Sequence, residues 1–243
     1  MLWRTFGGRC IYHSPTGIQI FDNYFFRWLK FDSEALQTLL FKLAPEHAGL
    51  DYIKALISPA KKMPGNTCML GLGGGGVAHA LSPFLINSTL LAVEYDEEVI
   101  QLAAQFFMTE QLSNLKVIHH EANEFVSNYS EQFLHIIVDL SNANSFPASC
   151  YNDEFFAQCK RILLPDGFLA VNLANPHEQR PVFEMIKKQF CGATVTLPIK
   201  ECANVVIIAC NSNKVSTLLD IFKNYPGLKR LTWDETWGCV AHL

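Results

Sequence analysis

The amino-acid sequence predicts an α/β fold, with a mostly parallel sheet, an antiparallel last strand and a small N-terminal β segment. Three observations support this. Strand-like and helix-like stretches alternate from residue 67 to residue 190, a run of glycines directly follows the first of these strands, and the last two strand-like stretches lie close together. Alternation of this kind is typical of a parallel sheet covered by helices on both faces.

The chain divides into two predicted parts. Residues 1–48 are rich in aromatic and β-branched residues and read as strands around a turn at Asp22 and Asn23, so we expect a small β segment. Residues 49–243 form the predicted main domain, which begins with a helix-like spacing of apolar residues from Leu50.

The predicted elements of the main domain follow one another in a regular order. Strand-like stretches cover residues 67–72, 89–95, 115–120, 134–140 and 167–173. Helix-like stretches cover residues 77–81, 96–107, 151–163 and 180–190. The last two strands, residues 193–198 and 204–211, are joined by too few residues for a helical crossover, and we therefore expect them to pair in the antiparallel direction.

Composition limits the classes of function. With 49% hydrophobic and 17% charged residues, the 243-residue chain supplies a large core, which excludes disorder as its main state. The 19 basic and 23 acidic residues form no long runs, so we expect no nucleic-acid partner. No apolar run suits a signal sequence or a membrane span, and the eight cysteines show no C-x-x-C spacing, so we expect a cytoplasmic protein with buried free thiols. Because His119 and His120 are adjacent in a strand, they point to opposite faces, and we expect no metal site there.

The glycine run at residues 71–76 is the clearest functional motif. It connects a predicted strand to a short helix, where glycines permit a tight turn and close approach of a ligand to the backbone. The motif predicts a nucleotide or nucleoside site, whereas the alternative is a packing turn. Gly71, Gly73 and Gly76 also fit G-x-G-x-x-G, so the motif alone does not separate NAD from S-adenosylmethionine (AdoMet).

Three acidic residues follow the carboxyl ends of predicted strands. Glu94, which is 18 residues after Gly76, is placed to accept the two ribose hydroxyl groups, and Glu121 is placed to meet an adenine amino group. Asp139 ends the fourth strand, where a carboxylate can orient a nucleophile and accept its proton. The alternative interpretations are an ordinary strand-end acid, a solvated loop acid and a loop-bracing aspartate, respectively.

The order of motifs resembles the spermidine synthase family, the polyamine aminopropyltransferases, and the sheet resembles class I AdoMet-dependent methyltransferases. The resemblance covers most of the chain and rests on the helix with Tyr52 and on GLGGGGV, VEYDEEVI, HEANEF, VDLSN, YNDEFF and LLPDG. It implies a transferase in which an amine attacks the methylene next to the sulfonium of decarboxylated AdoMet. It also implies a small amine or other nucleophilic acceptor, no metal and a homodimer.

The resemblance also implies roles for individual residues. Asp139 corresponds to the catalytic acid, and Tyr52 and Asn142 to substrate-binding positions. The residues implied to bind AdoMet, decarboxylated AdoMet or methylthioadenosine are Gly71, Gly73, Gly75, Glu94 and Glu121.

Two positions depart from the family pattern and leave the transferred group open. The family's glycine loop has an aspartate where this chain has Gly74, and its D-S-S-D run has a second acid where this chain has Asn142. Because a buried diamine needs paired carboxylates, we expect a degraded diamine pocket beside an intact nucleoside pocket. The alternatives are an AdoMet-dependent methyltransferase of unknown acceptor, a non-catalytic nucleoside-binding protein and an NAD-dependent oxidoreductase.

Overall fold

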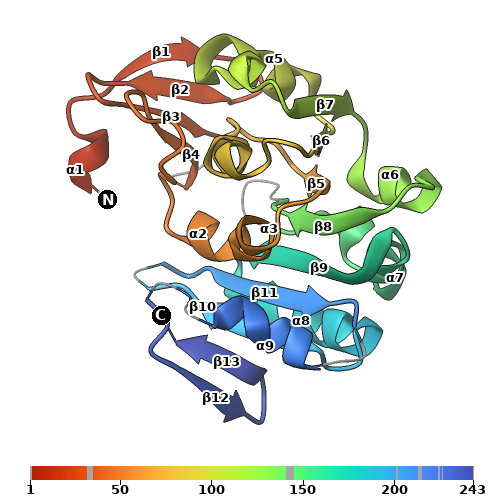
Figure 1. The fold of residues 1–243 in the computed structure, drawn as a ribbon. Helices are drawn as coiled ribbons and strands as arrows, with labels where there is room; N and C mark the ends of the chain where they lie inside the picture. Colours follow the sequence, from red (N-terminus) through yellow and green to blue (C-terminus); the bar gives the residue numbers. More distant parts are fainter. Residues whose placement is uncertain are drawn as a thin grey trace.

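The structure, a computed structural model, contains two β-sheets and describes residues 2–31, 35–140, 145–200, 202–212, 215–223, 225 and 227–242. A four-stranded antiparallel sheet comes first along the chain, and a nine-stranded, mostly parallel sheet follows (Figure 1). Within these residues, no helix combines the length and the apolar character needed to cross a membrane.

The N-terminal sheet is larger than the sequence predicted. Asn23 makes the expected turn, since its Oδ1 atom accepts hydrogen bonds from the N–H groups of Phe25 and Phe26 at 3.0 and 2.7 Å. A strand is added on each side of this hairpin, and a short helix precedes them. The elements are α1 (Leu2–Thr5), β1 (Arg9–His13), β2 (Gln19–Asp22), β3 (Phe26–Lys30) and β4 (Leu36–Phe41).

The central sheet has the strand order β12-β13-β10-β11-β9-β8-β5-β6-β7. Its strands are β5 (Thr67–Leu70), β6 (Leu90–Glu94), β7 (Leu115–His119), β8 (Phe133–Val138), β9 (Leu163–Leu173), β10 (Thr194–Pro198), β11 (Val205–Cys210), β12 (Arg230–Asp234) and β13 (Gly238–His242). The helices are α2 (Tyr52–Leu56), α3 (Ser58–Lys62), α4 (Gly76–Leu81), α5 (Glu97–Phe107), α6 (Ala122–Asn128), α7 (Asp153–Arg161), α8 (Pro176–Gln189) and α9 (Val215–Phe222). Three 3₁₀ turns complete them: η1 (Ser82–Phe84), η2 (Thr109–Gln111) and η3 (Ala148–Cys150).

Strand directions confirm the predicted sheet. Strands β5 to β9 run parallel to one another, whereas β11 lies antiparallel between β9 and β10. Residues 165–167, which end the LLPDG motif, form an irregularity inside β9. Asp166 has a φ of +60°, and the pairing with β8 jumps from Leu163 to Phe168.

The β12–β13 hairpin was not predicted from the sequence. Asp234 accepts hydrogen bonds from the N–H groups of Thr236 and Trp237, both at 2.8 Å, and Gly238 has a φ of +64°. These bonds close the turn, and β13 then adds to β10 in the parallel direction. The hairpin therefore extends the central sheet beyond its expected end.

The core forms two layers, one on each face of the central sheet. One layer packs under α2, α3, α4 and α9, and the other under α6, α7 and α8. Phe155 and Phe156 are fully buried in the second layer, and Phe107 is fully buried in a separate, smaller cluster that joins the N-terminal sheet to α5. All eight cysteines are free thiols, of which four are buried.

Candidate active site

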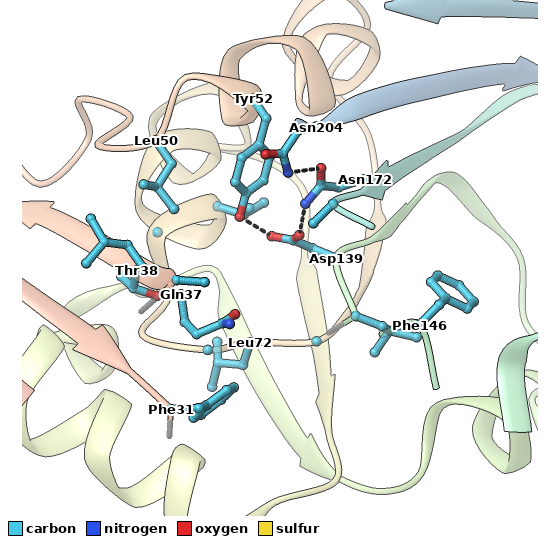
Figure 2. A pocket seen from close by; sticks show the side chains of 18 of the residues that line it. Phe31, Gln37, Thr38, Leu50, Tyr52, Leu72, Asp139, Phe146, Asn172 and Asn204 are labelled. Atoms are coloured by element: carbon cyan, nitrogen blue, oxygen red, sulfur yellow. Dashed lines mark hydrogen bonds between the residues drawn. The ribbon is translucent and has the colours of Figure 1, made fainter. Parts of the chain in front are cut away.

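A cavity of about 1010 Å³ opens at the carboxyl ends of the central parallel strands (Figure 2). The N-terminal sheet forms one wall through β4, and α2 forms another. The loops after β5, β6 and β8 supply the floor. Open α/β sheets place their ligand sites at this edge.

The glycine loop at residues 71–75 follows β5 directly. Gly71, Gly73 and Gly75 all have positive φ, at +92°, +52° and +75°, which glycine adopts without strain. A Cβ atom on Gly71 would lie 2.4 Å from the backbone oxygen of Asp139, so the loop approaches β8 more closely than any side chain allows. Gly71 and Gly73 line the cavity.

Packing at the start of α4 requires glycine at position 75. It precedes α4 as the N-cap residue, and a Cβ atom there would lie 2.4 Å from Cγ2 of Thr109. It is not among the residues that line the cavity. Its predicted contact with a nucleoside therefore stays a prediction.

Glu94 braces the glycine loop from the end of β6. Its side chain is buried, and its Oε2 atom accepts hydrogen bonds from the N–H groups of Leu72 at 2.9 Å and Gly73 at 3.5 Å. Its Oε1 atom accepts from Tyr95 and Asp96 at 3.0 and 3.2 Å. The carboxylate is thus fixed in the cavity wall by main-chain groups, at the position predicted for ribose binding. Asp96 is the N-cap of α5, as predicted.

Thr38 on β4 completes this side of the cavity. It is buried, and its Oγ1 atom accepts a hydrogen bond from the N–H group of Gly74 at 2.9 Å. A Cβ atom on Gly74 would lie 2.9 Å from Cγ2 of Thr38 and 3.0 Å from its Cβ. The side chain of Thr38 therefore fills the space that any side chain at position 74 would need.

Asp139 lies opposite, at the end of β8, and is held by a chain of hydrogen bonds (Figure 2). Its Oδ2 atom accepts from the Tyr52 hydroxyl at 3.0 Å, and its Oδ1 atom accepts from Nδ2 of Asn172 at 2.8 Å. The amide oxygen of Asn172 accepts in turn from Nδ2 of Asn204 at 2.8 Å. The structure thus brings the two predicted residues, Tyr52 and Asp139, into direct contact.

Burial controls the protonation of this group of residues. It raises the pKa of the Asp139 carboxyl, and the hydrogen bonds from Asn172 and Tyr52 act in the opposite direction. Burial, together with the neighbouring Asp139 carboxylate, raises the pKa of Tyr52 well above its usual range. Tyr52 is therefore a permanent hydrogen-bond donor at neutral pH, and Asp139 is a carboxylate with enhanced affinity for a proton.

Sequence reasoning missed the two asparagines. Asn172 falls within the predicted strand at residues 167–173 but is assigned no role there, whereas the structure shows it as a buried residue of β9 beside Asp139. Asn204 carried no motif, because it meets Asn172 only through the antiparallel docking of β11 on β9. The available signal was position, because Asn172 lies near the carboxyl end of its strand, at the edge where the three acidic residues were recognised.

Like Gly75, the predicted residue Glu121 does not line the cavity. Glu121 is the N-cap of α6, where it accepts hydrogen bonds from the N–H group of Glu124 at 2.7 Å and from the Ser149 hydroxyl at 2.9 Å. It is absent from the cavity lining, and its contact with adenine stays a prediction. Asn142 lies outside the described residues.

The charge of the cavity has one sign. Its lining contains five carboxylates, and none of the described lining residues is lysine, arginine or histidine. A cleft lined by one sign of charge raises the local concentration of ligands of the opposite sign. The described part of the chain also gathers no group of three or more histidine, cysteine or acidic side chains that would hold a metal ion. The five carboxylates belong to Asp51, Glu94, Asp96, Asp139 and Glu178.

Comparison with known sequences identifies relatives of two kinds. The family described as the spermine/spermidine synthase domain matches residues 52–217. Polyamine aminopropyltransferases from Chromobacterium violaceum and Neisseria meningitidis are 24% and 23% identical, covering 79% and 81% of this chain and 75% and 77% of those proteins. An eEF1A lysine and N-terminal methyltransferase homolog from Drosophila pseudoobscura pseudoobscura is 26% identical, over 70% of this chain and 27% of that protein.

Solved structures confirm the predicted fold class. A spermidine synthase in complex with the transition state analogue AdoDATO has a TM-score of 0.66 at 18% identity and covers 86% of this chain and 76% of its own. Human methyltransferase-like protein 13 in complex with SAH has a TM-score of 0.60 at 19% identity and covers 77% of this chain and 97% of its own. At these identities the likeness concerns the fold alone.

Proposed function

Because the chain belongs to the spermine/spermidine synthase domain family, we propose that it transfers the aminopropyl group of decarboxylated AdoMet to a small amine. The family matched here and the curated relatives are those of transferases. The observation that carries the proposal is the cavity itself, whose lining pairs a hydrogen-bonded, half-buried Asp139 with further carboxylates and no basic residue among the described positions.

The charge of the cavity favours the decarboxylated donor over AdoMet. AdoMet carries a carboxylate that needs a cation or free N–H groups as partners. The N–H groups of residues 71–75 already have acceptors: Gly71 donates to Val93, residues 72 and 73 to Glu94, Gly74 to Thr38, and Gly75 to Leu72. A donor whose tail is an ammonium group suits this surrounding better.

In this function the loop and Glu94 bind the nucleoside. Glu94 lines the cavity with its carboxylate held by main-chain N–H groups, and in this proposal that carboxylate accepts the ribose hydroxyl groups. Gly71 and Gly73 let the main chain approach the nucleoside closely, because no Cβ atom intervenes. Two solved neighbours were determined with adenosyl ligands, AdoDATO and SAH, which supports a ligand of this class.

The proposed transfer is an in-line displacement. The amine nitrogen forms a new bond to the methylene next to the sulfonium, the carbon–sulfur bond breaks, and its electron pair stays on sulfur as a neutral thioether. Asp139 accepts the proton that the amine loses, for which its raised pKa is suited. Tyr52 and Asn172 hold the carboxylate in one orientation, so that the amine lone pair points at the reacting carbon.

Methyl transfer from AdoMet is the second candidate. It is favoured by the similarity to the methyltransferase homolog from Drosophila pseudoobscura pseudoobscura and by the substitution of the family's aspartate by Gly74. The two candidates differ in the donor they bind and in the group that appears on the acceptor.

Calorimetric titration separates the candidates. The purified protein is titrated with decarboxylated AdoMet, AdoMet, methylthioadenosine and NAD, each with and without putrescine. We expect the decarboxylated donor to bind more tightly than AdoMet, with turnover that Asp139→Asn abolishes while binding persists. Preference for AdoMet regardless of putrescine would support the methyltransferase. Binding without turnover would support a nucleoside-binding protein, and binding of NAD alone would contradict both transferases.

The family resemblance also supports a homodimer in the cytoplasm, and we propose both. Sedimentation of the full chain and fractionation of cells that express it at native level are the corresponding measurements.

A further inference from the structure

Strand β12 forms an open edge of the central sheet (Figure 1). It comprises Arg230–Asp234 and, among the strands that the structure describes, pairs only with β13. An edge strand presents unpaired N–H and C=O groups along its outer side and is a template for another strand. Two apolar side chains on it are also exposed, Trp233 at 79% and Leu231 at 38% of their full surface.

We propose that the β12 edge binds a second copy of itself, antiparallel, about a two-fold axis through Thr232. The sequence of the strand, RLTWD, is complementary to its own reversal. In this register Arg230 faces the partner's Asp234, Leu231 faces the partner's Trp233, and the two Thr232 residues face each other. The two nine-stranded sheets thereby become continuous.

Side-chain chemistry favours this register. Opposite charges and aromatic–aliphatic pairs facing each other across antiparallel strands are both stabilising. Leu231 and Trp233 lie on the same face as Ala241 and Cys239, their partners on β13. A two-fold axis supplies each contact twice, because the same patch serves both copies.

The opposite edge of the sheet, strand β7, carries a feature that opposes pairing with another strand. Strand β7 carries an exposed lysine, Lys116, near its middle. A lysine on an edge strand is a common way to keep that strand from pairing with another, because pairing would desolvate the charge. In β12, by contrast, the two charges lie at the two ends with opposite sign, so that self-pairing neutralises both.

This inference rests on the proposed homodimer and names its interface. Two five-residue strands and their four apolar side chains bury less surface than a standard interface. We therefore expect a dimer that dissociates on dilution rather than an obligate one.

Cross-linking tests the register directly. In a background with Cys10, Cys191 and Cys202 replaced by serine, Thr232→Cys places two thiols opposite each other across the axis. Facing Cβ atoms are about 4.5–5.5 Å apart, close to disulfide geometry. We expect oxidised glutathione to produce a disulfide dimer with Thr232→Cys but not with Arg230→Cys, since the two residues at position 230 lie about 14 Å apart in this register. Equal yields from the two variants would contradict the register.

Sedimentation tests the interface without cysteines. Arg230→Asp places aspartates opposite each other twice, and we expect dimerisation to weaken at least about tenfold. Lys116→Asp makes the same charge change on the opposite edge and leaves dimerisation unchanged. A monomeric wild type at all concentrations would contradict both the dimer and its interface. A wild-type dimer that Arg230→Asp leaves intact would contradict only the interface and would point to another surface, such as the exposed Phe6 and Tyr24.

Discussion

The two sides of the cavity are held by different kinds of hydrogen bond. On the loop side, formed by residues 71–75, Glu94 and Thr38, main-chain N–H groups donate to side-chain acceptors. On the carboxylate side, formed by Tyr52, Asp139, Asn172 and Asn204, side chains hold one another. Main-chain N–H donors remain when a side chain is substituted, whereas each side-chain hydrogen bond is lost when its residue changes. In the proposed function, substitutions on the carboxylate side would therefore alter the acceptor chemistry while the loop side keeps its geometry for the nucleoside.

The largest effect is expected from a substitution that changes the carboxylate side alone. Asp139→Asn keeps the shape of the side chain but removes the proton acceptor, so kcat should fall about 10²–10⁴-fold. Affinity for methylthioadenosine, measured by calorimetry, should stay within a factor of a few. Equal losses in kcat and in nucleoside affinity would show that the two sides are not separable.

The next largest effect is expected from a substitution on the loop side. Glu94→Gln puts an amide NH₂ where one carboxylate oxygen accepts two main-chain N–H groups. Hydrogen bonds to charged groups contribute about 1.5–3 kcal/mol, so nucleoside affinity should fall about tenfold to a hundredfold. Asp96→Asn is the matched control, because asparagine also serves as an N-cap. Calorimetry on the two variants measures the difference, and equal losses would exclude a special role for Glu94.

A third, smaller effect is expected where the glycine loop packs against β4. Gly74→Ala adds a methyl group 2.9–3.0 Å from the Thr38 side chain, and this overpacking should lower the free energy of unfolding by about 1–3 kcal/mol. In a Thr38→Ser background, which removes Cγ2, the cost should be smaller. Gly76→Ala is the control, since its added carbon meets Ile53 at an ordinary 3.4 Å. Denaturant unfolding gives the coupling energy, and additive costs would contradict the steric account.

The smallest effect concerns pH. The hydrogen bond from Tyr52 lowers the pKa of Asp139, against the upward effect of burial. Tyr52→Phe should therefore raise that pKa further. If the reaction needs the carboxylate, activity rises with pH through the pKa of Asp139, so the acidic limb of the kcat profile should move to higher pH. Tyr225→Phe, which loses only a hydrogen bond to the Lys54 carbonyl, should leave the limb in place.

The difference between the two sides also explains what the sequence could predict. The glycine run, Glu94 and Asp139 follow strands whose patterns are local, so their place at one edge of the sheet follows from parallel topology. Thr38 and Asn204 meet their partners across 36 and 32 residues of chain, and no local pattern marks such contacts. The β12–β13 hairpin was not predicted for the same reason, since its place in the sheet depends on the pairing of β13 with the distant strand β10.

The contact between Thr38 and Gly74 has a consequence for how such proteins diversify. The family match begins at residue 52, so the strand that fills the space beside Gly74 lies outside the matched segment. An exchange of N-terminal sheets between relatives would carry with it one wall of the cavity, the proposed nucleoside pocket. A chimera that combined a loop aspartate with this β4 would be sterically mismatched, and positions 38 and 74 must therefore be inherited as a pair.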